Sequence, residues 1–216
     1  MKKLSLIIAL IVAGSVSAQV SFSGGSSTIK GFGTSKWFTG FHVGVEVPRD
    51  DAMSFYGRYT HQFARGGDSI IGVAVANSAT TTPYILNVTG VPTMNYNIFE
   101  GGTRYYLGDG FDFGLAGYGG TNFTLIYNKT TAKYEDFDED LYTLDPSTER
   151  NGAIISLGMG LSGGVKYTFP RLGTFYTDFS ASYLFLGQAS TQSTYTDLYS
   201  RVLFGINVGY RRDLFW

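Results

Sequence analysis

The sequence predicts an all-β fold, a transmembrane antiparallel up-and-down β-barrel of eight strands that follows an N-terminal signal peptide. Three observations predict this fold. Bulky residues alternate with small polar residues at a period of two, charged residues are confined to one face of that alternation, and the connections between strands alternate short and long. The composition agrees, because only 15% of the 216 residues are charged, against about 25% in an ordinary soluble domain.

Two further properties of the composition exclude classes of function. The chain has no cysteine, which excludes disulfide scaffolds, thiol catalysis and cysteine metal sites. Its formal net charge of −1 argues against a basic surface for nucleic acid. No nucleic-acid partner is therefore expected.

Residues 1–18 have the pattern of a secretory signal peptide. Lys2 and Lys3 precede an apolar stretch from Leu4 to Ala13, and small residues follow up to Ala18. We therefore expect the signal peptide at 1–18 and the barrel domain at 19–216, with an uncleaved anchor helix as the alternative. No other apolar run approaches the roughly 20 residues of a membrane-spanning helix.

Eight segments show the period-two alternation. In the second of them Phe41, Val43 and Val45 share one face, and His42 and Glu46 share the other. In chain order the predicted strands are Gln19–Gly25, Trp37–Val47, Phe55–Phe63, Phe99–Leu107, Phe111–Leu125, Ile155–Tyr167, Phe175–Phe185 and Val202–Tyr210.

The charged residues decide which face of the strands lies inside. Across the seven long segments the bulky face carries no charged residue, whereas the opposite face carries seven: Glu46, Arg58, Glu100, Arg104, Asp112, Lys166 and Asp178. A soluble barrel would bury its bulky face. Here the polar face suits the interior of a narrow barrel and the bulky face suits lipid. A closed barrel leaves no unpaired strand edge in hydrocarbon.

The connections predict which end of the barrel faces outward. Short, turn-like connections cover residues 48–53, 108–110 and 170–174, and long ones cover 26–36, 64–93, 127–151 and 187–199. Short periplasmic turns and long external loops are the outer-membrane arrangement. Within the second long connection, Ser69–Ala76 and Pro83–Val91 are apolar enough to be strands. They form either a hairpin above the membrane or two further membrane strands, which would make ten.

Several segments together resemble the outer-membrane β-barrel (porin-like) domain family of Gram-negative bacteria, which includes the small OmpA/OmpX-type barrels. These segments are Gln19–Phe22, Gly40–Glu46, Gly102–Leu107 with Phe113–Gly117, Gly158–Tyr167 and Gly205–Tyr210, followed by a C-terminal Leu-Phe-Trp216. The resemblance implies an integral protein of the cell outer membrane, in contact with outer-membrane lipid and lipopolysaccharide. The terminal aromatic resembles the signal read by the barrel-assembly machinery, which is then a partner during biogenesis. Arg211-Arg212-Asp213 departs from the family, whose members more often end directly on an aromatic.

The luminal charges predict a neutralising network. Each periplasmic hairpin places one acid near one base: Glu46 with Arg58, Arg104 with Asp112, and Lys166 with Asp178. We expect these charges, with Glu100, to plug the periplasmic half of the barrel, because unpaired buried charges are costly. The alternative is a gated pore whose salt bridges rearrange.

No catalytic residue and no cofactor is predicted. His42 is expected to face the lumen. His61 is expected to face outward near the external interface, with no serine nearby. A lipid-modifying enzyme, which would need histidine, serine and a carboxylate together, therefore remains a distant alternative.

The acidic segment 134–145 contains a weak candidate for a metal site. Asp136, Asp138 and Asp140 mimic the start of a calcium-binding loop, but Leu141 replaces the required glycine and Ser147 replaces the bidentate glutamate. A solvated acidic loop is the simpler interpretation.

The leading functional hypothesis is a non-enzymatic barrel with a closed lumen and long extracellular loops, acting as an envelope scaffold or as a surface adhesion or interaction protein. The loops at 64–93 and 127–151 are the expected contact regions for an extracellular partner. The alternative is a small gated pore or transporter for ions or small solutes, since inward glycines such as Gly40 and Gly102 leave space in the lumen.

Overall fold

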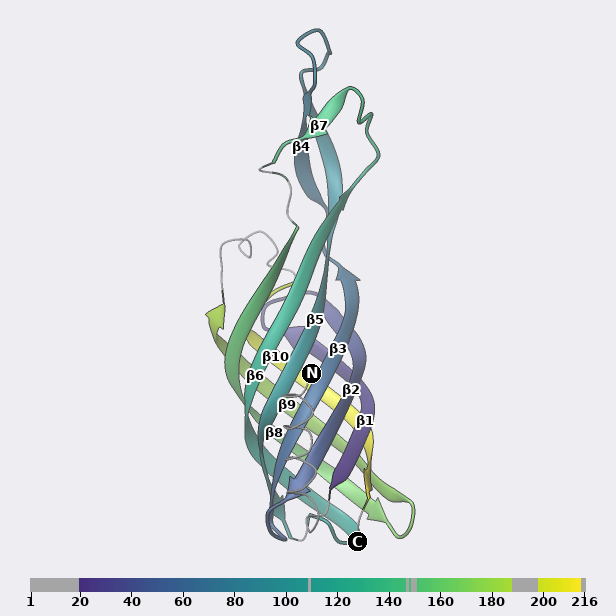
Figure 1. Ribbon diagram of the computed structural model, residues 1–216, viewed down its shortest axis with the longest axis vertical. Helices are drawn as coiled ribbons and strands as arrows, with labels where there is room; N and C mark the ends of the chain where they lie inside the picture. Colours follow the sequence, from purple (N-terminus) through teal and green to yellow (C-terminus); the bar gives the residue numbers. More distant parts are fainter. Residues whose placement is uncertain (1–19, 109, 147, 149–150, 188–197, 215–216) are drawn as a thin grey trace, which may run out of the picture.

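The computed structural model describes residues 20–108, 110–146, 148, 151–187 and 198–214 as one ten-stranded antiparallel sheet (Figure 1). The strands are β1 (Ser21–Gly31), β2 (Trp37–Pro48), β3 (Met53–Gly66), β4 (Ile70–Ala76), β5 (Ile85–Leu107), β6 (Gly114–Tyr134), β7 (Tyr142–Leu144), β8 (Gly152–Phe169), β9 (Gly173–Gly187) and β10 (Val202–Asp213). The predicted signal peptide and the last two residues lie outside the described residues. In the part of the chain that is described, no helix is long and apolar enough to cross a membrane.

Eight of these strands close into a barrel. Their order is β3-β2-β1-β10-β9-β8-β6-β5, and β3 also pairs with β5, which completes the ring. The prediction of an all-β, eight-stranded antiparallel barrel is confirmed.

The alternative of ten membrane strands is wrong. β4 pairs only with the first residues of β5 and with the short strand β7, so it is not a member of the ring. Figure 1 shows β4, β7 and the start of β5 standing above one side of the barrel. We call this part, residues 67–92, 133–146 and 148, the extracellular wall, after the side on which the sequence analysis expects the long connections.

Several strands extend beyond their predicted ends. β6 continues to Tyr134, where it still pairs with Gly90 of β5, and β1 continues to Gly31. On these extensions the outward residues, such as Ser26 and Thr28 of β1 and Lys129 of β6, are not bulky and apolar, so alternation loses the signal that marks a strand. At the end of the barrel with the short turns, Phe111 and Asp112 lie in the turn before β6 instead of in a strand.

The two faces of the strands have the predicted orientation. On β2, Phe41, Val43 and Val45 point outward with 42–50% of their surfaces exposed, whereas His42 and Glu46 point inward and are 1% exposed. The barrel therefore presents an apolar exterior and a polar lumen, the reverse of a soluble barrel.

The strands approach one another most closely where inward glycines lie. A Cβ at Gly102 of β5 would lie 2.1 Å from the carbonyl oxygen of Thr121 on β6, so only glycine fits there. At its neighbour Gly101, which points outward, the nearest atom to a Cβ would be 3.9 Å away, which is an ordinary contact.

This pair of glycines gives a matched test of the packing. We expect Gly102→Ala to lower the free energy of unfolding by about 1–3 kcal/mol, because the backbone of β6 must move. Gly101→Ala should leave it nearly unchanged. Urea titration of the refolded protein measures both. Equal effects of the two substitutions would contradict the close β5–β6 packing.

Candidate functional site

The lumen of the barrel holds the charged residues that the sequence places on the inner face. Three arginines and three carboxylates form a connected ion-pair chain, defined here as the ionic layer: Glu46 (β2), Arg58 (β3), Glu100 and Arg104 (β5), Asp178 (β9) and Arg211 (β10). All six side chains point inward, because each residue occupies one of the alternate strand positions that face the lumen. These six groups have equal numbers of positive and negative charges. Arg211 Nε also lies 3.5 Å from Oδ1 of a fourth carboxylate, Asp213, and the buried Lys166 supplies a fourth positive charge.

Glu46 lies on the side of the ionic layer nearer to the short turns. Its Oε2 accepts from Arg104 Nη1 at 2.7 Å and lies 3.4 Å from Arg211 Nη1. Its Oε1 accepts from Ser54 Oγ at 2.6 Å and from the Tyr106 hydroxyl. Both carboxylate oxygens are therefore satisfied in a site that excludes water.

Asp178 anchors the other side. It accepts from Arg58 Nη1 at 3.0 Å and from Asn207 Nδ2 at 2.6 Å, and Arg104 Nη2 lies 3.4 Å away. Arg58 Nε also donates to Glu100 at 2.7 Å. Arg104 thus bridges Glu46 and Asp178 across the lumen.

Tyrosine rings surround the bridging arginine. The Arg104 guanidinium carbon lies 4.3, 5.1 and 5.9 Å from the ring centres of Tyr56, Tyr118 and Tyr176. Cation–π contacts of this kind strengthen in a desolvated site. The rings fill the space around the guanidinium that water would otherwise occupy.

The pairing predicted along each hairpin is wrong. Glu46 pairs with Arg104 and Arg211 instead of Arg58, and Asp178 pairs with Arg58 and Arg104 instead of Lys166. The physical reason is register. Arg58 lies directly opposite Glu100 in the β3–β5 pairing, and the narrow lumen lets long side chains cross it.

Asp112 and Lys166 lie outside the ionic layer. Asp112 is in the exposed turn before β6, and its carbonyl oxygen accepts from Lys166 Nζ at 2.9 Å. Lys166 also donates to Thr168 Oγ1 at 3.0 Å. The predicted pair of Arg104 with Asp112 does not form, because Arg104 contacts Glu46 and Asp178 instead.

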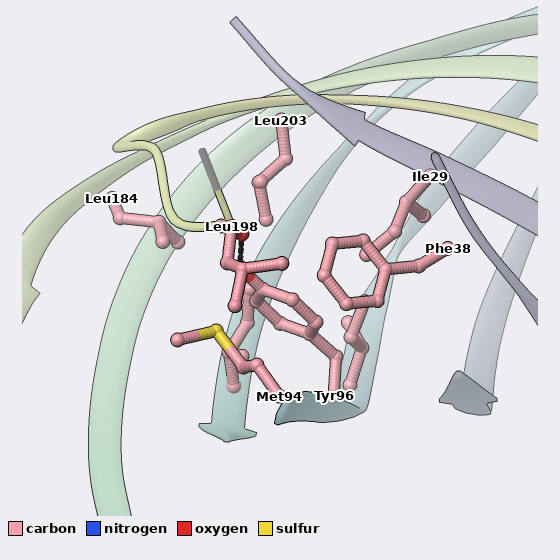
Figure 2. Close-up of a cluster of buried hydrophobic side chains, with 9 residues drawn as sticks. Ile29, Phe38, Met94, Tyr96, Leu184, Leu198 and Leu203 are labelled. Carbon is pink, nitrogen blue, oxygen red and sulfur yellow. Dashed lines mark hydrogen bonds between the residues drawn. The ribbon is translucent and has the colours of Figure 1, made fainter. Parts of the chain in front are cut away.

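A second, apolar layer of buried side chains fills the half of the lumen nearer to the extracellular wall (Figure 2). Its members are Ile29, Phe38, Met94, Tyr96, Ile98, Ile126, Leu184, Leu198 and Leu203. Leu198, just before β10, is 1% exposed, and its carbonyl oxygen accepts from the Tyr96 hydroxyl at 2.7 Å. This layer was not predicted from the sequence. The signal for it is that inward positions change from polar to apolar toward the extracellular ends of the strands, as at Phe38 and Ile126.

A small cavity separates the two layers. Its volume is about 20 Å³, and its lining runs from Arg58 and Glu100 to Ile98, Ile126 and Leu203. This volume holds roughly one water molecule. Among the described residues, buried side chains thus fill the lumen at two levels.

The two histidines and the acidic loop make other contacts. His42 faces the lumen, where Nε2 lies 2.6 Å from the Tyr176 hydroxyl, and His61 faces outward with Nδ1 2.9 Å from Asn97 Oδ1. Asp138 accepts from the backbone of Asp140 at 3.0 Å. Among the described residues, no three His, Cys, Asp or Glu side chains, Asp136 included, group as a metal site.

The ionic layer can be tested through Asp178. We expect Asp178→Asn to lower the free energy of unfolding by about 3 kcal/mol, because Arg58 and Arg104 lose a buried counter-charge. Asp136→Asn, in the exposed loop, should change it by less than about 0.5 kcal/mol. Urea unfolding of the refolded variants is the measurement. An unchanged free energy of unfolding in Asp178→Asn would contradict the stabilising role of the ionic layer.

Comparison with known proteins supports the fold. No protein-family model and no curated protein matches the chain. Among solved structures, Neisserial surface protein A aligns with 11% identity over 91% of this chain and 97% of its own, at a TM-score of 0.51. Ail, the attachment invasion locus protein of Yersinia pestis (13% identity, 90% and 97% coverage), and OprG of Pseudomonas aeruginosa (12%, 91% and 97%) align at TM-scores of 0.46 and 0.44. The chain therefore has the fold of the small eight-stranded outer-membrane β-barrels.

Proposed function

We propose that the protein is an integral outer-membrane barrel with a permanently closed lumen, and that it acts at the cell surface by presenting its extracellular wall to a partner. The observation that carries this proposal is the double closure of the lumen, by the ionic layer and the apolar layer. A barrel closed in this way is a rigid support.

The outer surface of the barrel supports insertion in a membrane. Large apolar side chains such as Leu115, Leu161 and Phe179 are 60–74% exposed, which is unfavourable in water and favourable in lipid. Outward Asn95 and Asn97 mark the external limit of this apolar belt on β5. Residence among outer-membrane lipid and lipopolysaccharide, after export and insertion by the barrel-assembly machinery, is part of the proposal.

The extracellular wall supports the surface role. It has its own small core, in which Ala74, Ala76, Val88 and Tyr142 are buried. Tyr142 also donates from its hydroxyl to the carbonyl oxygen of Pro83 at 2.9 Å. Regular strands therefore occupy much of the predicted loop at 64–93, and an ordered surface of this kind is a suitable platform for binding.

The pore alternative is less well supported. Ions would have to displace both layers, and Arg104 alone contacts two carboxylates and lies near three tyrosine rings. The absence of enzymatic activity stays a prediction. The side chain of His42 contacts the Tyr176 hydroxyl and that of His61 contacts Asn97, neither of which is a serine or a carboxylate.

Single-channel recording in a planar bilayer tests the proposal. The refolded protein should give no discrete current steps, and Arg104→Ala should also be silent because the apolar layer still seals the lumen. A variant that truncates both layers, Phe38→Ala with Tyr96→Ala and Arg104→Ala, should conduct. Steps from the unmodified protein would overturn the proposal.

A further inference from the structure

One face of the extracellular wall carries apolar side chains that are at least partly exposed, with the polar Asn87 and Thr89 of β5 opposite Val73 and Ile71. The outward row of β4 consists of Ile71, Val73 and Val75, and Val75 lies opposite Ile85 of β5. Ile71 is 76% exposed and Ile85 is 57% exposed. We call these four residues the wall patch. The opposite face of the same strands is the one that packs into the wall's core.

The wall patch stands clear of the apolar belt that faces lipid. Between the two, the outward residues of β5 include Thr93, Asn95 and Asn97, and Asn97 Oδ1 accepts from the Tyr59 hydroxyl at 2.8 Å. Ile85 lies ten residues beyond Asn95, which is roughly 30 Å along the strand. Lipid hydrocarbon therefore does not account for the patch.

Acidic residues border the wall patch on both sides. Residues 133–145 contain six acids and one lysine, a formal charge of −5 in a chain whose net charge is −1. This segment lies beside β5, where the Glu135 amide donates to the Thr89 carbonyl oxygen at 2.8 Å. It also lies beside β4, where the Asp145 amide donates to Val73 at 2.8 Å.

At the tip of the wall the same segment passes over the end of β4. There Asn77 Nδ2 donates to the carbonyl oxygen of Asp140 at 3.1 Å. The patch thus has an apolar centre and a negatively charged rim. A desolvated apolar centre with a polar rim is the usual anatomy of a protein interface.

We propose that the wall patch is a docking surface for a basic protein segment, whose apolar side chains cover Ile71, Val73 and Ile85 while its lysines or arginines meet the acidic rim. Charge complementarity selects this occupant. A second copy of the chain brings the same −5 rim, and the phosphates of lipopolysaccharide are also negative, so both are repelled. The inference rests on the proposed function, because it names the partner class of the wall.

The chain offers a matched pair of substitutions. Tyr84 and Ile85 are adjacent and almost equally exposed, at 58% and 57%. They lie on opposite faces of the hairpin. The carbonyl oxygen of Tyr84 accepts from the backbone amide of the inward residue Ala76 at 2.9 Å, whereas Ile85 pairs with the outward residue Val75. Changing either to serine removes a similar exposed apolar side chain from the same hairpin.

The experiment uses the full chain refolded into phospholipid nanodiscs. The probes are a fluorescein-labelled ten-residue peptide of alternating valine and lysine and a matched valine–glutamate peptide. The lysine peptide should bind, Ile85→Ser should weaken its binding about tenfold, and Tyr84→Ser should change it less than twofold. The glutamate peptide and empty nanodiscs should not bind.

A rim variant tests the charge separately. Glu135→Gln with Asp136→Asn and Glu139→Gln should remove most of the salt dependence of lysine-peptide binding. Equal binding by the two peptides, equal effects of Ile85→Ser and Tyr84→Ser, or no binding at all would overturn the proposal. The proposal would also be overturned if light scattering showed that the unmodified protein is a dimer and that Ile85→Ser is a monomer. None of these results opens the lumen, so current recordings test the proposed function independently.

Discussion

The charged side chains buried inside a narrow barrel must neutralise one another, and this constraint shapes the rest of the structure. Isolated buried charges cost several kcal/mol each, so the strands must meet in the register that brings arginines and carboxylates together. Arg104 is at the centre of this arrangement because it contacts both Glu46 and Asp178. Tyr56 and Tyr118 complete its surroundings with their rings.

A single strand connects this network to the other functional parts. β5 spans 23 residues and contributes Glu100 and Arg104 to the ionic layer, Tyr96 and Ile98 to the apolar layer, and Ile85 to the wall patch. Both layers therefore pack against the base of β5. Under the proposed function, a wall held at its base in this way needs less ordering when it meets a partner, which lowers the entropy cost of binding.

The sequence predicted which residues face the lumen and which face outward, but not which charged residues form ion pairs. The period of two separates Phe41 from His42 without any knowledge of neighbours, because lipid and lumen impose opposite chemistry on alternate residues. The partner of Arg58 depends instead on the β3–β5 register, which follows from closing the ring across the long segment between these strands. Local spacing along a hairpin contains no information about that closure.

The ends of the strands and the apolar layer were likewise not predicted from local sequence patterns. Beyond the lipid boundary, the outward face of β6 reads Lys129, Thr131 and Lys133, so the alternation that predicts a strand fades although pairing continues to Tyr134. The apolar layer was detectable in principle from Phe38 and Ile126. The apolar layer was not predicted, because the prediction of the lumen rested on the charged inward residues alone.

The most direct test of this account is a pair of double-mutant cycles measured by urea unfolding. The first combines Glu46→Gln with Arg104→Gln, whose side chains are 2.7 Å apart across the lumen, and should give a coupling energy of about 1.5 kcal/mol or more. The second combines Glu46→Gln with Arg58→Gln, which the ionic layer connects only indirectly through Arg104 and Asp178, and should give a clearly smaller coupling energy. A larger coupling between Glu46 and Arg58 would show that the charges pair along the hairpins and would contradict the network that closes the lumen.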